Sequence, residues 1–184
     1  MNVLKTERLQ LRHLRAPDIT ALAPLYGNPN VMHFYNDGLT LSRNQTQGII
    51  DYYSKFGKKN KSGIWAVLNR ESGRFLGVGG IVTTQTGFKL RRQWEVSYML
   101  APEQWGQGLA TELLAGLVDY GFAVLRAQTL LALIHPNNAA SIRVAVKNGF
   151  TPKEETTTAR GPRVVYVLEN PDENGRLPYF WQRE

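Results

Sequence analysis

Two glycines that stand two positions apart, Gly106 and Gly108, constrain this 184-residue chain most strongly. They belong to the run Trp105-Gly106-Gln107-Gly108, which separates a strand pattern ending at Leu100 from a helical pattern beginning at Leu109. A helix N-terminus offers unpaired N–H groups and a partial positive charge, and glycines let a ligand approach the backbone closely. The run therefore predicts a phosphate-binding turn, although a tight strand-to-helix turn without a ligand can use the same residues.

Two common phosphate motifs do not fit this turn. A dinucleotide-binding fingerprint requires Gly or Ala where the chain has Thr111, and an acidic residue after the next strand, where it has His135. A Gly-Lys-Ser/Thr sequence, which phosphate-loop NTPases require, does not occur in the chain. The phosphate therefore belongs to another kind of ligand.

The hydrophobic patterns predict a single α/β domain over residues 1–184, with a core at about 6–170 and a tail at 171–184 in which Trp181 has a structural role. A mixed, mainly antiparallel central sheet is flanked by helices in the order β-α-α-β-β-β-α-β-α-β-β. The predicted strands are 8–14, 64–69, 75–84, 94–100, 129–134, 151–157 and 164–168. The predicted helices are 17–26, ended by Asn28-Pro29-Asn30, then about 42–56, 109–125 and 138–148, with a basic stretch at 89–92 between two of the strands.

Composition excludes several kinds of chemistry. The chain has no cysteine, so it forms no disulfide, no thiolate metal site and no cysteine acyl-enzyme intermediate. Its three histidines lack the paired spacing of metal ligands, and we expect no metal. No apolar run approaches the roughly 18 residues that span a bilayer, and no signal peptide is evident, which favours the cytoplasm and no membrane partner. A net charge of +7 suits CoA phosphates, acidic proteins or RNA.

A second segment, 138–150, follows a predicted strand and contains Asn138 and Ser141 on one helix face. Both side chains could face a common cleft. Asn138 is also a good helix cap and Ser141 a tolerable first-turn residue, so capping explains the pattern equally well.

Taken together, these two segments resemble the acetyl-CoA motifs of the GCN5-related N-acetyltransferase (GNAT) superfamily. The stretches 6–12 and 28–32 resemble the branch that contains the ribosomal-protein N-terminal (alanine) acetyltransferases. The resemblance implies acetyl-CoA as cosubstrate, with the turn on its pyrophosphate and strand 94–100 beside its pantetheine arm. It implies a cofactor-binding set of Met99, Leu100, Trp105, Gly106, Gln107, Gly108, Leu109, Ala110, Thr111, Asn138 and Ser141.

The chain departs from the superfamily pattern at two positions. Trp105 replaces the usual Gln or Arg at the start of the phosphate motif, a substitution common in this branch. Ala145 stands where many members carry a tyrosine general acid, four residues before the final Gly-Phe. The second departure removes the most common candidate for the acid.

Amide formation requires a base for the amine, a donor for the oxyanion and an acid for the departing thiolate. Glu95 is the candidate base, because it lies on the strand expected beside the thioester and matches an acidic position in this branch. An ordinary surface role for Glu95 stays open. Ser141 is the candidate acid, as the resemblance implies, and a backbone N–H near Met99 or Leu100 is the candidate oxyanion donor.

The predicted acceptor is the α-amine of a protein or peptide, with a ribosomal protein among the candidates. An α-amine is roughly 10% neutral at pH 7, whereas lysine is far below 1% neutral, so a water-linked carboxylate suits the α-amine better. Small amines of the antibiotic, polyamine or amino-acid type stay open, as do a CoA-binding sensor or scaffold, a disfavoured RNA-associated module and a homodimer. The acceptor pocket is expected near the 156–163 loop, with His33, Phe34, Tyr35, Trp65 and Tyr98.

Overall fold

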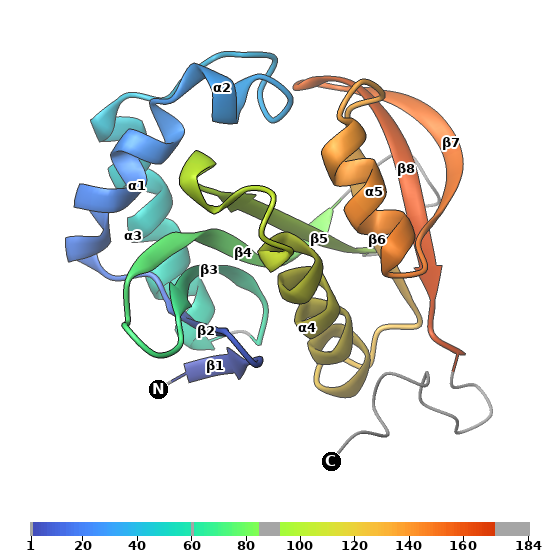
Figure 1. Ribbon diagram of the computed structural model, residues 1–184, viewed down its shortest axis with the longest axis horizontal. Helices are drawn as coiled ribbons and strands as arrows, with labels where there is room; N and C mark the ends of the chain where they lie inside the picture. Colours follow the sequence, from blue (N-terminus) through green and yellow to red (C-terminus); the bar gives the residue numbers. More distant parts are fainter. Residues whose placement is uncertain (1, 60, 85–92, 172–184) are drawn as a thin grey trace.

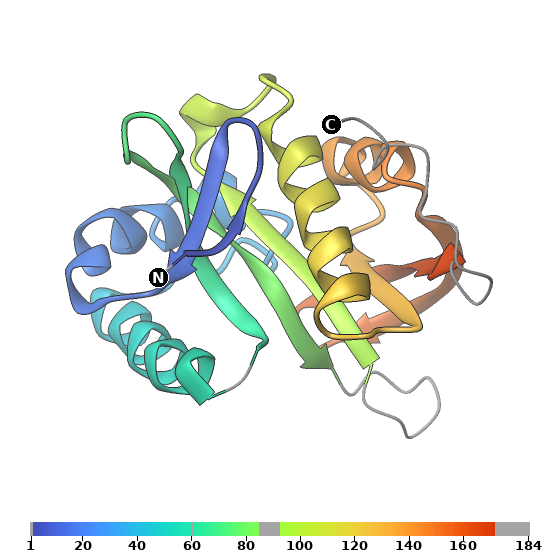
Figure 2. The same ribbon diagram turned by 90° about the horizontal axis from the view of Figure 1, so that it is seen from below.

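A computed structural model of the chain describes residues 2–59, 61–84 and 93–171. Its centre is an eight-stranded sheet with the strand order β1-β2-β3-β4-β5-β6-β8-β7 (Figures 1 and 2). Neighbouring strands are antiparallel except β5 and β6, which are parallel. The strands are β1 (Asn2–Lys5), β2 (Leu9–His13), β3 (Gly63–Asn69), β4 (Phe75–Thr84), β5 (Gln93–Leu100), β6 (Thr129–Ile134), β7 (Thr151–Thr158) and β8 (Gly161–Glu169).

Helices cover both faces of this sheet (Figure 1). The helices α1 (Ile19–Tyr26) and α3 (Arg43–Lys59) pack against one face, and α4 (Leu109–Ala123) and α5 (Ala139–Lys147) against the other. Short 3-10 turns, Ala16–Asp18 and Pro102–Gln104, precede α1 and the glycine-rich turn. The sequence of β3 is continuously apolar because both faces of this strand are buried. Ile64 and Ala66 join the core under α1 and α3, while Trp65 and Val67 join the core under α4.

The predicted order of elements is confirmed, with two additions that the sequence did not reveal. Strand β1 is a four-residue edge strand, too short to show a clear alternation. The helix α2 (Pro29–Met32) begins at the same residues that end α1, because the Asn28 side chain accepts a hydrogen bond from the N–H of Asn30 at 2.9 Å and caps a new turn. The basic stretch 89–92 and residues 172–184, with Trp181, lie outside the described residues.

The parallel contact between β5 and β6 is short, and this positions the site. The two strands pair only at Trp94 with Leu130 and at Glu95 with Leu131. Beyond Glu95, β5 continues to pair with β4 as far as Leu100, while its other edge separates from β6. The sheet therefore opens between its two halves, and the backbone of β5 is left without a strand partner on that side.

Candidate active site

A cleft of about 560 Å³ opens where β5 and β6 diverge. Its wall is formed by both strands, the turn before α4, one side of α5, the segment around α2 and the loop between β7 and β8. Most of the residues predicted from the sequence meet here. They are Phe34, Tyr35, Glu95, Tyr98, Met99, Leu100, Trp105, Gly106, Gly108, Leu109, Ala110, Thr111, Asn138 and Ser141.

At one end of the cleft, the glycine-rich turn presents its backbone. Gly106 and Gly108 both have a φ of +75°, in the left-handed region that side chains disfavour, and Gly108 is the N-cap of α4. A Cβ atom at Gly106 would meet no atom within 4 Å, so the space in front of the turn is open. The Trp105 indole N–H donates to the Leu100 carbonyl at 2.8 Å and ties the turn to the end of β5. This arrangement fits the pyrophosphate of CoA.

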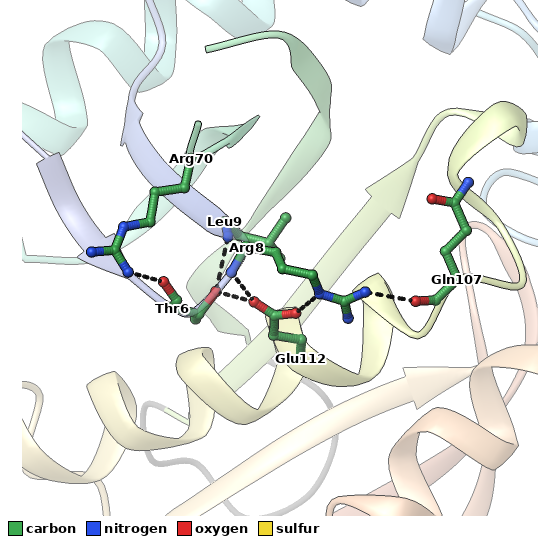
Figure 3. A network of polar contacts seen from close by, with 6 residues as sticks. All are labelled: Thr6, Arg8, Leu9, Arg70, Gln107 and Glu112. Carbon is green, nitrogen blue, oxygen red and sulfur yellow. Dashed lines mark hydrogen bonds and ion pairs between the residues drawn. The ribbon is translucent and has the colours of Figure 1, made fainter. Parts of the chain in front are cut away.

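The turn is held in place by a polar network around Glu112, in the first turn of α4 (Figure 3). The Glu112 carboxylate accepts hydrogen bonds from the Thr6 hydroxyl at 2.5 Å and from the Arg8 backbone N–H at 2.7 Å, and it forms an ion pair with the Arg8 guanidinium at 2.6 Å. Another guanidinium N–H of Arg8 donates to the Gln107 carbonyl at 3.0 Å. The segment between β1 and β2 is thereby connected to the turn itself.

This network predicts an acid-sensitive contribution to stability. Burial acts to raise the pKa of Glu112, but the hydrogen bonds from Thr6 and Arg8 and the charge of Arg8 outweigh it and lower that pKa. The contribution is therefore present above the unfolded-state pKa of about 4.3 and is lost as the pH falls through the lower folded-state value. Because Arg8 is nearly half exposed, we expect Glu112→Ala to cost only about 1–2 kcal/mol at pH 7.

Urea denaturation of the wild type and of Glu112→Ala, at several pH values between neutrality and strong acid, would measure the difference in their free energies of unfolding. Glu103→Ala is the matched control, because Glu103 is an exposed acid in the neighbouring 3-10 turn. A difference between wild type and Glu112→Ala that stays constant down to pH 2 would contradict the ionic origin of the effect.

In the middle of the cleft, Asn138 and Ser141 stand at the start of α5. The Asn138 side chain accepts the Ser141 backbone N–H at 3.1 Å, so Asn138 is the helix cap and also lines the cleft. Across from them lies the buried Tyr98 hydroxyl. Burial raises the pKa of Tyr98 to about 12, while a side-chain hydrogen bond with Ser141 acts to lower it. Ala145 is buried in the core beneath α5 and does not line the cleft.

At the other end of the cleft, the Glu95 side chain lies near Arg160 of the β7–β8 loop and Arg163 of β8. Glu95 is only 6% exposed, and its Oε1 lies 3.8 Å from Nη2 of Arg160. Burial raises the pKa of the Glu95 carboxyl, and the charge of Arg160, the hydrogen bond of Thr84 and the charge of Arg163 act against this rise. The carboxyl is thus poised to exchange protons at a higher pH than an exposed glutamate does.

Three residues predicted from the sequence lie elsewhere. Trp65 packs in the core on the α4 side of the sheet, with its ring 5.2 Å from that of Tyr120, because strand alternation directs it there. The exposed His33 packs beside Phe34 at 4.4 Å but does not line the cleft. Gln107 is exposed, and its side-chain amide donates to the Glu103 carbonyl at 2.7 Å, so only its backbone belongs to the turn.

The cleft also contains basic residues that the sequence analysis did not single out. Arg143 and Lys147 of α5 also line the cleft, and the spacing of four residues between them places both on one helix face. That spacing does not connect them to Asn138 and Ser141. The prediction of a loop over 156–163 was wrong, because β7 extends to Thr158 and β8 begins at Gly161. Arg160 therefore lies in the short loop between these strands and Arg163 lies on β8, and no local pattern distinguished either from solvated charges. The described residues contain no cluster of three His, Cys, Asp or Glu side chains that could hold a metal ion.

Comparison with known proteins identifies the domain. The model of the acetyltransferase (GNAT) domain matches residues 8–151. The Bacillus subtilis protein YkkB is 34% identical over 164 residues, which are 89% of this chain and 93% of YkkB. The crystal structure of an acetyltransferase from Agrobacterium tumefaciens superposes with a TM-score of 0.76 at 25% identity, covering 92% of this chain and 95% of that one.

Solved structures of acetyltransferases that are named for different acceptors share the same fold. A ribosomal-protein-S5-alanine acetyltransferase from Vibrio fischeri has a TM-score of 0.74 at 16% identity, over 94% of this chain and 98% of that one. A spermidine N-acetyltransferase from Vibrio cholerae, in complex with CoA and spermine, has a TM-score of 0.72 at 19% identity, over 89% of this chain and 96% of that one. At such identities the likeness extends to the fold and leaves the acceptor undetermined. Among the described residues, no helix is long and apolar enough to cross a membrane.

Proposed function

Because the chain belongs to the acetyltransferase (GNAT) family, we propose that the amine it acetylates is the α-amine of a protein or peptide N-terminus. The chain is an acetyl-CoA-dependent N-acetyltransferase. The glycine-rich turn would hold the pyrophosphate, and the unpaired edge of β5 would hold the pantetheine arm. What this proposal adds to the family assignment is the class of amine.

The observation that carries the proposal is the buried Glu95 beside Arg160 in the cleft. A carboxylate is a weak base, even when burial raises its pKa, and it serves best when the amine is already partly neutral. An α-amine is about a tenth neutral at pH 7, whereas a lysine amine is far below 1% neutral. Glu95 therefore suits an α-amine better than a lysine side chain.

Three groups of the chain then act as the base, the oxyanion donor and the acid of the reaction. Glu95 takes the proton of the amine, directly or through one water, as the amine nitrogen forms its bond to the thioester carbonyl carbon. A backbone N–H near Met99 or Leu100 donates to the oxygen that gains negative charge. The carbon–sulfur bond then breaks, and the Ser141 hydroxyl donates a proton to the departing thiolate and regains one from solvent. The products are the acetylated amine and CoA, and no covalent enzyme intermediate is needed.

The experiment that tests the proposal is CoA release from acetyl-CoA by the purified protein. The acceptors are N-terminal peptides, including those of ribosomal proteins, together with internal-lysine peptides, polyamines, aminoglycosides and free amino acids. We expect peptides with a free α-amine to react and the same peptides with a blocked N-terminus to be inert. CoA binding, measured in parallel by calorimetry, separates inactive protein from an unsuitable acceptor.

Other outcomes would replace the proposed acceptor. Turnover on polyamines or aminoglycosides alone would make the chain a small-molecule acetyltransferase. Tight CoA binding without turnover on any acceptor would favour a sensor or scaffold. Salt-sensitive binding to RNA without CoA would favour an RNA-associated module.

A further inference from the structure

The charges that line the cleft are unequal in number. Among its described lining residues are four cations, Arg143, Lys147, Arg160 and Arg163, and one carboxylate, Glu95. The C-terminal part of α5, with Lys147, adjoins the start of α4, since the Asn148 amide next to it donates to the Thr111 carbonyl at 3.4 Å. Lys147 is thus near the phosphate-binding turn. Arg160 and Arg163 lie at the acceptor end, where CoA phosphates do not explain them.

The two arginines at the acceptor end have different surroundings. Arg163 is 4% exposed, and its guanidinium donates to the Pro162 carbonyl at 2.6 Å and to the Tyr35 carbonyl at 3.0 Å. The bond to Tyr35 joins β8 to the segment after α2, so Arg163 has a structural role. Its charge still contributes to the field in the cleft.

Arg160 is arranged differently and is accessible from the cleft. Its side chain is 35% exposed, and its guanidinium carbon lies 5.2 Å from the centre of the Tyr35 ring. Its contact with Glu95, at 3.8 Å, is too long for a hydrogen bond. The Tyr35 side chain also forms a hydrogen bond with Arg160, so this contact restrains the guanidinium. Its remaining in-plane N–H groups are available to a carboxylate, which an arginine can bind through two parallel hydrogen bonds.

We propose that Arg160 binds a carboxylate of the acceptor, so that the preferred acceptor is a peptide with an acidic side chain in its first two residues. This inference rests on the proposed function, because it assumes that the reacting α-amine lies near Glu95. A group served by Glu95 lies about 3 Å from it, or one water further away. Arg160 is 3.8 Å from the same carboxylate, and one extended residue spans about 3.5 Å. A carboxylate that reaches Arg160 therefore belongs to the first or second residue. Polyamines and aminoglycosides would instead bring further positive charge toward two arginines.

Matched peptides test this selectivity. One pair of peptides differs only in Asp or Asn at the first residue, a second pair only in Asp or Asn at the second residue, and each pair has a counterpart with Lys there; all are compared by kcat/KM at pH 7. A charge-assisted hydrogen bond contributes about 1.5–3 kcal/mol, so in at least one pair we expect the Asp peptide to be favoured over the Asn peptide about 10- to 100-fold, and its Lys counterpart to be poorest. In Arg160→Gln this preference should fall to about one, and Arg160→Lys should recover only part of it.

The comparison within each variant removes indirect effects. Loss of Arg160 also changes the charge near Glu95, but this affects the Asp and Asn peptides alike, so their ratio reports the direct contact. Arg43→Gln, an exposed arginine on α3, removes the same net charge and should keep the wild-type ratio. Equal wild-type rates on the Asp and Asn peptides of both pairs, or an unchanged ratio in Arg160→Gln, would overturn the inference while leaving an α-amine acetyltransferase in place. Turnover on free aspartate or glutamate alone would overturn its peptide part, and no turnover on any α-amine would point to failure of the proposed function itself.

Discussion

Gly108→Val should reduce the affinity for CoA by about 100-fold or more. Gly108 caps α4 with a φ of +75°, and a β-branched residue at that angle is a severe backbone outlier that costs roughly 1–3 kcal/mol. To escape this strain, the turn must rotate the N–H groups that converge on the phosphate site. A loss of about 2.7 kcal/mol in binding corresponds to the expected 100-fold change. Calorimetric titration with CoA measures it.

Gly73→Val is the matched control for this experiment. Gly73 has a φ of +70° in the turn between β3 and β4, and a Cβ atom there meets nothing within 4 Å. The two variants therefore share the backbone strain, but Gly73 does not line the cleft. We expect a comparable loss of stability and unchanged CoA affinity in Gly73→Val. Wild-type CoA affinity in a folded Gly108→Val protein would rule out the turn as the phosphate site.

Glu95→Gln should lower kcat/KM by about 100-fold or more while leaving the affinity for CoA unchanged. General bases contribute factors of about 10² to 10⁴, and glutamine cannot accept the proton. We expect the wild-type rate to fall as the pH drops through the pKa of Glu95, because protonation would remove the base, and burial raises this pKa above that of an exposed glutamate. In Glu95→Gln this acid limb of the pH–rate profile should disappear, so that only the ionisation of the amine still affects the rate. Steady-state kinetics across pH 5–9 tests both expectations.

The Glu95→Gln variant should fold well, because glutamine has nearly the same shape as glutamate and avoids burying a charge. Glu155→Gln, an exposed glutamate on β7, removes the same charge and should behave like the wild type. Ser141→Ala separates the two proton-transfer groups, since it should lower kcat but retain the acid limb of the profile. A Glu95→Gln enzyme within a few-fold of the wild-type rate, with the same pH profile, would exclude Glu95 as the base.

Local sequence was sufficient to predict most of the elements and the glycine-rich turn between β5 and α4. Alternation and helical spacing follow from backbone geometry within a few residues, so most strands and helices were recognisable without any tertiary contact. The glycines at 106 and 108 were equally informative, because a positive φ is a requirement of the residue itself. Edge strand β1 escaped prediction because its four residues show no pattern and its pairing with β2 defines it.

The sequence by itself therefore determined the class of the domain, the order of most of its elements, the position of the glycine-rich turn and the exclusion of cysteine chemistry. The tertiary structure decided which side chains share the cleft. It directed Trp65 into the core, joined Arg8 to Glu112 across 104 positions, and brought Arg160 of the β7–β8 loop to Glu95 on β5. Such contacts depend on strand register and on the divergence of β5 from β6, which are long-range properties that no local pattern encodes.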